Sequence, residues 1–258
     1  VAPSNSTSSA DAIATFDVNL TNGSEYLVIA NGILGDATNP FGLAVTDMAR
    51  SVATDAGQVD LITFHGSPGA PAVDVDVRGV GNVISNLSFG NFTDYLSVAA
   101  GKYYLDIRPA GVPAILNTYA ADLSGVAGQS VTLVASGLLI GDPGFSALAV
   151  LADGTVIPLE ASPVANVQVI HNAIGADTVD IYAGDALLLD DFAYRTATPF
   201  TFLPAGVDIT LGVAPSNSTS SADAIATFDV NLTNGSEYLV IANGILGDAT
   251  NPFGLAVT

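Results

Sequence analysis

Residues 72–78 read AVDVDVR, and the alternation of valine with charged residues in this stretch decides the fold class. Successive side chains of a β-strand point to opposite faces of the sheet. Val73, Val75 and Val77 therefore fall on one face, and the charged residues fall on the other. The stretch predicts a strand with one buried face and one solvated face.

Similar β-rich runs continue along the rest of the chain, bounded by Gly, Pro, Asn and Asp. The clearest are residues 59–65, 102–108, 130–135, 167–171, 178–183, 200–203, 207–212, 224–232, 237–242 and 253–257. About seven or eight short strands in roughly 100 residues are typical of an immunoglobulin-like sandwich. We therefore predict an all-β protein made of tandem immunoglobulin-like antiparallel β-sandwich domains.

An internal repeat sets the domain organisation. Residues 1–46 recur without a single change at residues 213–258, an offset of 212 residues. Weaker self-similarity at an offset of 106 residues relates residues 73–75 (VDV) to residues 179–181 (VDI). One period of 212 residues therefore holds two related modules.

This organisation predicts five segments. They are a C-terminal sandwich half (1–46), a linker (47–56), a first complete β-sandwich (57–159), a second linker (160–163) and a second complete β-sandwich (164–258). Two interpretations of the first segment stay open. The chain is a window of a longer array, or it is a subunit with duplicated ends, whose first segment completes a neighbour's sandwich by strand exchange. Both predict head-to-tail assembly.

The composition excludes several classes of protein. With 5 Lys and Arg against 25 Asp and Glu, the formal net charge is -20, so the chain cannot build the basic face that binds nucleic acid. Hydrophobic residues make up 49% of the chain, which argues against disorder. No run of about 18 uncharged apolar residues occurs, so we expect no membrane insertion. The absence of cysteine excludes disulfides and thiolate chemistry.

Residues 65–75, HGSPGAPAVDV, carry a family resemblance. With the later runs AAGKY (99–103) and VASG (134–137), they resemble the domain-of-unknown-function 4397 family of bacterial and archaeal surface proteins. The corresponding residues 171–180 match more loosely, because they lack both prolines, whereas the PAG turn at 204–206 is kept. The resemblance implies an extracellular immunoglobulin-like sandwich and brings no catalytic residues.

Few residues are candidates for chemistry. His65 and His171 end equivalent strands. We expect each ring to form a hydrogen bond with the following turn and not to bind a metal. The abundance of Asp suits calcium, but the densest acidic spots do not match a calcium-loop pattern. Those spots are Asp190-Asp191 and the Asp74/Asp76 pair. We expect no catalytic residue, no cofactor and no enzyme activity, with calcium as the only candidate ion.

Three Gly-Asp pairs occupy matching positions after hydrophobic runs, at residues 35–36, 141–142 and 247–248. Glycine permits a left-handed backbone, and the Asp side chain accepts hydrogen bonds from turn amides. We therefore predict that these pairs shape turns.

Asn-x-Ser/Thr sequons are frequent, and we predict glycosylation at an outer surface as one interpretation, with Asn-rich turns as the other. The candidate acceptors are Asn5, Asn19, Asn22, Asn86, Asn91, Asn217, Asn231 and Asn234. Edge strands are the candidate assembly contacts, because unpaired ladders invite pairing with another chain. Their candidate residues are Ala12, Ile13, Phe16, Val18, Ala224, Ile225, Phe228 and Val230.

These observations lead to a structural hypothesis. We expect a subunit or repeat segment of an extracellular or cell-surface filament, whose partners are copies of itself in a linear polymer. The alternative is a stalk or ligand-binding region of a cell-surface adhesin that recognises glycans or other cells.

Overall fold

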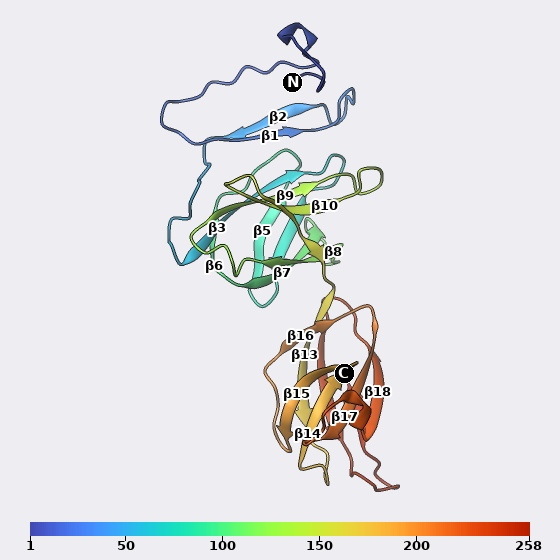
Figure 1. Cartoon of the computed structure of the whole chain (residues 1–258). Coiled ribbons are helices and arrows are strands. Elements are labelled where there is room, and N and C mark those ends of the chain that lie inside the picture. The colour runs from blue at the N-terminus through green and yellow to red at the C-terminus, as the bar shows by residue number, and fades with distance from the viewer. The chain divides into compact units, whose positions relative to one another are not determined.

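The protein folds almost entirely as β-strands and turns. The structure is a computed structural model and describes residues 1–258 (Figure 1). Two short 3-10 helices occur, η1 (Ser9–Asp11) and η2 (Ser221–Asp223). The chain divides into two compact units, Val1–Ala161 and Ser162–Thr258. No helix is long and apolar enough to cross a membrane.

The first unit contains a complete β-sandwich. One sheet has the order β11-β10-β9-β3-β6 and the other the order β12-β8-β7-β4-β5. The strands are β3 (Gln58–Gly66), β4 (Val73–Val77), β5 (Gly81–Leu87), β6 (Leu96–Ala99), β7 (Lys102–Pro109), β8 (Asn117–Asp122), β9 (Ser130–Ser136), β10 (Ser146–Leu151), β11 (Val156–Pro158) and β12 (Glu160–Ala161). Residues 160–161, which were expected in a linker, thus pair with β8. All pairings are antiparallel except that of β3 with β9.

The alternation in β4 is observed as predicted. Val75 and Val77 are buried between the sheets. Asp76, which lies between them in the sequence, instead forms an ion pair of 2.5 Å with Arg108 of the neighbouring strand. Apolar burial on one face and ion pairing on the other thus fix the register of this strand.

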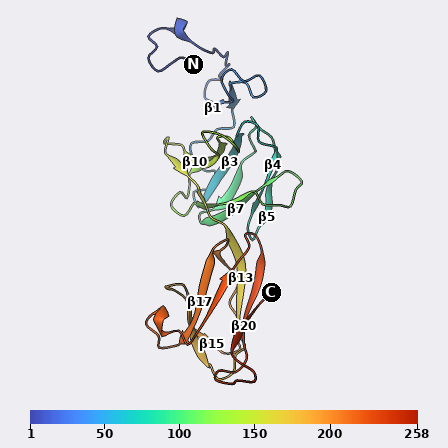
Figure 2. The ribbon, with the colours of Figure 1, turned by 90° about the vertical axis from the view of Figure 1, so that its right-hand side faces the viewer.

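The second unit is a sandwich of the same kind. Its sheets have the orders β16-β13-β19-β20 and β15-β14-β17-β18. Figure 2 shows this sandwich with β13, β15, β17 and β20 labelled. The strands are β13 (Val164–His171), β14 (Thr178–Ala183), β15 (Ala186–Ala193), β16 (Thr201–Pro204), β17 (Asp208–Pro215), β18 (Ala226–Asn231), β19 (Glu237–Asn243) and β20 (Gly254–Val257). Here, too, one pair is parallel, β13 with β19.

The two sandwiches share one topology. Strands β3 to β10 pair in the same order as strands β13 to β20, so these eight strands have counterparts, and the first sandwich adds β11 and β12. This confirms the prediction of an all-β chain with two related modules. The parallel pair in each sandwich joins strands that lie about 70 residues apart in the sequence, such as Asp60 with Ser130. Local sequence patterns do not reveal such pairings.

Residues 1–46 adopt much less regular structure. They contain η1 and one hairpin, in which β1 (Leu27–Asn31) pairs with β2 (Gly42–Thr46). This two-stranded sheet has no third strand, and residues 12–26 form no strand at all.

The linker at residues 47–56 contains no helix and is held to the first sandwich by a buried carboxylate. Asp60 accepts hydrogen bonds from Arg50 Nη1 (2.6 Å), from the Thr54 backbone N–H (3.0 Å) and from the Ser97 hydroxyl. Burial alone would raise the pKa of Asp60, but these hydrogen bonds outweigh burial and lower the pKa to about 2.

Candidate assembly segment and ligand sites

The duplicated sequence adopts two different structures in one chain. In residues 213–258 it completes the second sandwich, where β19 lies between β13 and β20 as a strand of seven residues. In residues 1–46 the matching strand, β1, has five residues and pairs only with β2. One edge of β1 is therefore left without a strand partner.

Burial differs in the same way. Leu232 is 1% exposed, whereas the identical Leu20 is 57% exposed. Val240 is 3% exposed, whereas Val28 is 51% exposed. The apolar side chains that form the core of the second sandwich are therefore left uncovered in the first copy. The single set of residues 164–212 in this chain covers the second copy.

The candidate assembly residues divide along the same line. In the second copy, β18 contains Phe228 and Val230, and Ala224 and Ile225 lie just before it. In the first copy none of the four matching residues lies in a strand; these are Ala12, Ile13, Phe16 and Val18. Their role in assembly stays a prediction.

One aromatic contact survives in both copies. The rings of Phe228 and Phe253 lie 5.8 Å apart, and those of Phe16 and Phe41 lie 5.9 Å apart. Phe41 and Phe253 lie at equivalent places in the two copies. Phe41 thus keeps its contact with Phe16, although Phe16 lies in no strand.

Seven of the eight sequon asparagines are exposed. The exception is Asn234, which is half-buried and accepts a hydrogen bond from the Val164 backbone N–H at 3.0 Å. Its identical counterpart, Asn22, is exposed. Glycosylation stays a prediction for these sites, and the structure makes seven of them accessible.

The two histidines occupy equivalent turns. The Nε2 atom of His65 lies 3.0 Å from the Pro71 carbonyl, and that of His171 lies 2.7 Å from the Ala176 carbonyl. In each ring Nδ1 accepts a backbone N–H two residues ahead. Both rings are buried and hydrogen-bond the turn that follows the strand, as the sequence predicted.

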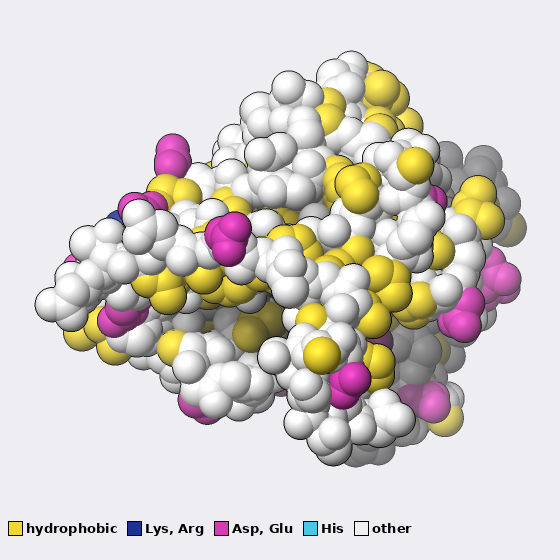
Figure 3. Space-filling view, turned by 90° about the horizontal axis from the view of Figure 1, so that it is seen from above, with side chains coloured by type: hydrophobic (Ala, Val, Ile, Leu, Met, Phe, Trp, Pro, Cys, Tyr) yellow, Lys and Arg dark blue, Asp and Glu magenta, His cyan; other side chains and the backbone are white.

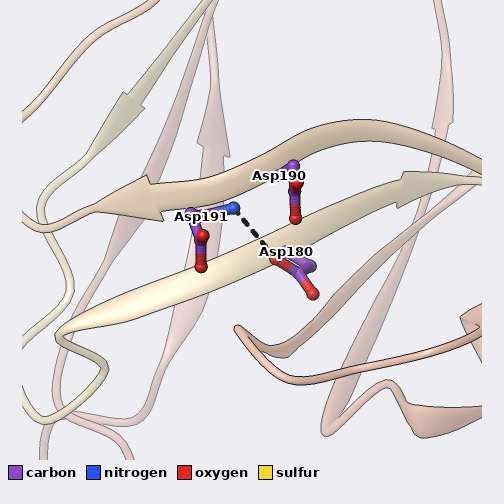
Figure 4. Close-up of side chains that lie close together, drawn as sticks. All are labelled: Asp180, Asp190 and Asp191. Atoms are coloured by element: carbon purple, nitrogen blue, oxygen red, sulfur yellow. Dashed lines mark hydrogen bonds between the residues drawn. The ribbon is translucent and has the colours of Figure 1, made fainter.

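Three carboxylates meet at β14 and β15. Oxygens of Asp180, Asp190 and Asp191 lie within 4.8 Å of one another (Figure 4). Asp180 is buried and already accepts the Asp191 backbone N–H (3.0 Å) and the Ser218 hydroxyl (2.5 Å). Burial raises the pKa of Asp180, but these hydrogen bonds outweigh it, so the pKa lies below its ordinary value. No metal is predicted here, and calcium stays only a candidate, because exposed acidic groups often gather without an ion.

In the first sandwich, the residue equivalent to Asp180 is Asp74, and it too accepts hydrogen bonds from backbone N–H groups. Asp74 accepts the backbone N–H groups of Asn86 (2.8 Å) and Gly111 (2.9 Å), and these bonds lower its pKa. Asn86 and Asp191 both have a positive φ, 53° and 52°. In each sandwich the Asp at this equivalent position thus holds, by a hydrogen bond, a residue of the neighbouring strand that has a positive φ.

The few basic side chains are engaged within the chain. The ion pairs are Arg50–Asp60, Arg78–Asp106 and Arg108–Asp76. On the face drawn in Figure 3, hydrophobic side chains lie in several groups, acidic ones are scattered and basic ones are almost absent. This face of the protein therefore offers apolar contacts and negative charge.

A family model confirms the resemblance noted in the sequence. The model for the domain of unknown function DUF4397 matches residues 63–159 and 165–257. The chain belongs to this family. Its two DUF4397 matches coincide with the two sandwiches, and no curated protein matches the chain.

Three solved structures illustrate the similarity of this DUF4397 chain to other β-proteins. A family 26 carbohydrate-binding module of Eubacterium rectale, in complex with maltoheptaose, is 14% identical, with coverage of 77% of this chain and 96% of that one and a TM-score of 0.23. The pilus adhesin SpaC of Lactobacillus rhamnosus GG is 14% identical (80% and 35% covered, TM-score 0.23). A putative cell adhesion protein of Bacteroides fragilis is 10% identical (94% and 92% covered, TM-score 0.19). TM-scores this low carry no argument about function.

Proposed function

We propose that this protein is a structural segment of an extracellular or cell-surface array, in which residues 1–46 complete a sandwich with a segment equivalent to residues 164–212 from a preceding unit. Such completion links units head to tail. The proposal assigns the chain no catalytic activity and no cofactor.

One observation carries the proposal. The same 46 residues are buried as half of a sandwich at residues 213–258 and are uncovered at residues 1–46. Three elements pair with the second copy: β13 with β19, β14 with residues 213–215, and residues 208–212 of β17 with β18. An identical sequence has an identical preference for that partner, because the apolar side chains and the open edge of β1 are the same groups.

The test uses the absence of native cysteine. In a Val28→Cys chain, we expect a maleimide to label the thiol rapidly. Addition of a polypeptide with the sequence of residues 164–212 is expected to slow labelling at least tenfold, because the new partner covers the side chain. In the matched Val240→Cys chain, labelling is expected to be slow throughout. Unchanged labelling of Val28→Cys at saturating polypeptide would overturn the proposal.

The preceding unit is either a second copy or an earlier part of a longer chain. The mass of the native chain under denaturing conditions separates these sources. A mass near 25.9 kDa supports association of separate copies, and a much larger mass supports one long array.

The alternative function is a glycan-binding stretch of an adhesin. Titration of the whole chain with maltoheptaose, the ligand named for the Eubacterium module, separates the two functions. The structural proposal predicts no saturable heat of binding, and a saturable isotherm would favour the adhesin.

A further inference from the structure

The first sandwich is hollow, whereas the second is filled. A cavity of about 420 Å³ lies between the two sheets of the first sandwich. The corresponding space in the second sandwich measures about 20 Å³. Because the eight strands that the two sandwiches share pair in the same order, that strand order does not by itself create the cavity, and the side chains of the first sandwich must contribute to it.

Two equivalent positions explain much of the difference. Ala147 of β10 lies opposite Ala135 in the register, and Leu255 of β20 takes the same place opposite Ala242 in the second sandwich. Ala147 lines the cavity, and Leu255 lines the residual space.

The second position lies on the other sheet. Leu87 of β5 pairs with Val73, and Phe192 of β15 pairs with Val179 at the equivalent place. At both positions the second sandwich carries the larger side chain, which fills the space between its sheets.

The lining defines the chemistry of an occupant. No Asp, Glu, Lys or Arg contributes to it. Among its polar residues, both ring nitrogens of His65 are engaged by its own turn, and the Asn117 side chain bonds the Tyr119 hydroxyl (3.1 Å) and the Thr118 backbone N–H (2.9 Å). Thr63 also contributes to the lining, and the remaining residues are apolar apart from the Tyr119 hydroxyl, with Phe64, Leu105 and Leu133 among them.

An apolar space of this size is costly when it is empty. Protein interiors pack like organic crystals, and atoms that line a void lose their dispersion contacts on one side. Water does not recover this loss, because it needs two or more polar partners. Engineered apolar cavities of about 150 Å³ bind benzene. A larger hydrocarbon ligand would restore the missing contacts in the present cavity.

We propose that the first sandwich binds an uncharged, predominantly hydrocarbon molecule larger than benzene between its two sheets. This site is independent of the assembly proposed for residues 1–46, so either proposal can fail without the other.

The experiment is a fluorescence titration of the whole chain with N-phenyl-1-naphthylamine, an uncharged apolar dye. We expect saturable binding of one dye per chain, with a rise in the thermal midpoint. Its anionic analogue 1-anilinonaphthalene-8-sulfonate is expected to bind at least tenfold more weakly, because no cation lines the cavity. Absence of dye binding by the native chain would overturn the proposal.

Two matched variants locate the site. Ala147→Leu is expected to fill the cavity and weaken dye binding at least tenfold, while it leaves or raises the thermal midpoint. Leu255→Ala is expected to open the second sandwich, so that a second dye binds. Leu87→Phe provides a second way to fill the cavity if Ala147→Leu does not fold, as judged by circular dichroism. Undiminished dye binding by a folded variant with a filled cavity would show that the dye binds elsewhere.

Discussion

Residues 1–46 and residues 213–258 have one sequence and two structures, and the features that they share are local. Each copy contains a short 3-10 helix in which an Asp accepts backbone N–H groups of the preceding turn. Each also has an Asp-capped turn, since Asp36 accepts the amides of Thr38 and Asn39 just as Asp248 accepts those of Thr250 and Asn251. The sequence of the segment is therefore sufficient to form these turns.

The features that differ depend on distant partners. Residues 226–231 form β18 against β17, whereas the identical residues 14–19 form no strand. A strand needs a neighbouring ladder and a covered apolar face, and a lone hairpin is marginal in water. The comparison teaches that this sequence forms its turns and the β1–β2 hairpin alone, and forms a strand at residues 226–231 only together with residues 164–212.

The largest expected effect tests the difference in burial. Leu232→Ala is expected to lower the free energy of unfolding by about 2–5 kcal/mol, because it leaves a void in the second core. Leu20→Ala changes an exposed side chain and is expected to cost less than about 0.5 kcal/mol. Urea unfolding followed by circular dichroism measures both. Equal losses in the two variants would contradict the structural difference between the copies.

A buried hydrogen bond provides the next test. Ser218→Ala removes a donor to buried Asp180, and hydrogen bonds to charged groups contribute about 1.5–3 kcal/mol. Ser6→Ala, at the matching position, is expected to be neutral.

The same pair has a pH signature. The folded-state pKa of Asp180 is depressed, so its stabilisation is present above the ordinary value of 3.8 and is lost as the pH falls through the lower folded-state pKa. The Ser218→Ala chain is expected to lose less stability on acidification than the native chain. An equally steep acid limb in both chains would show that this bond does not depress the pKa.

A third test concerns the linker that follows the first copy. The pKa of Asp60 is about 2 against an ordinary 3.8, so its bonds contribute about 2 kcal/mol above pH 4 that is lost as the pH falls towards 2. Asp60→Asn is expected to flatten this acid limb in unfolding experiments. Asn166 holds the equivalent place in the second sandwich, so Asn166→Ala serves as the control without a carboxylate.

The smallest effect on stability comes from the sequons. In a host that glycosylates Asn-x-Ser/Thr, Asn22 is accessible, whereas Asn234 is half-buried and bonded to Val164. Asn22→Gln is therefore expected to remove one glycan from the intact mass, and Asn234→Gln to remove none. The reverse result would show that the second copy is open to the glycosylating enzyme.

The sequence predicted what depends on local pattern. The alternating valines predicted β4, the internal repeat predicted two modules, and residues 65–75 indicated the family. A strand expected at residues 224–232 forms, but its identical counterpart does not, because pattern alone cannot say whether a partner is present. The Asp60–Arg50 bond and the cavity also escaped prediction, since they depend on side chains brought together by folding. Alignment of Ala147 with Leu255 is the signal that could have pointed to the cavity.

The internal engagement of the arginines has a consequence for the solution behaviour of the protein. Three of the five basic side chains form ion pairs and the net charge is -20, so the protein presents other copies with mainly like charges. Repulsion between such surfaces reaches about 30 Å at 0.01 M salt but only about 3 Å at 1 M. Two copies are therefore expected to repel each other over a long range in dilute buffer and only over a short range in concentrated salt.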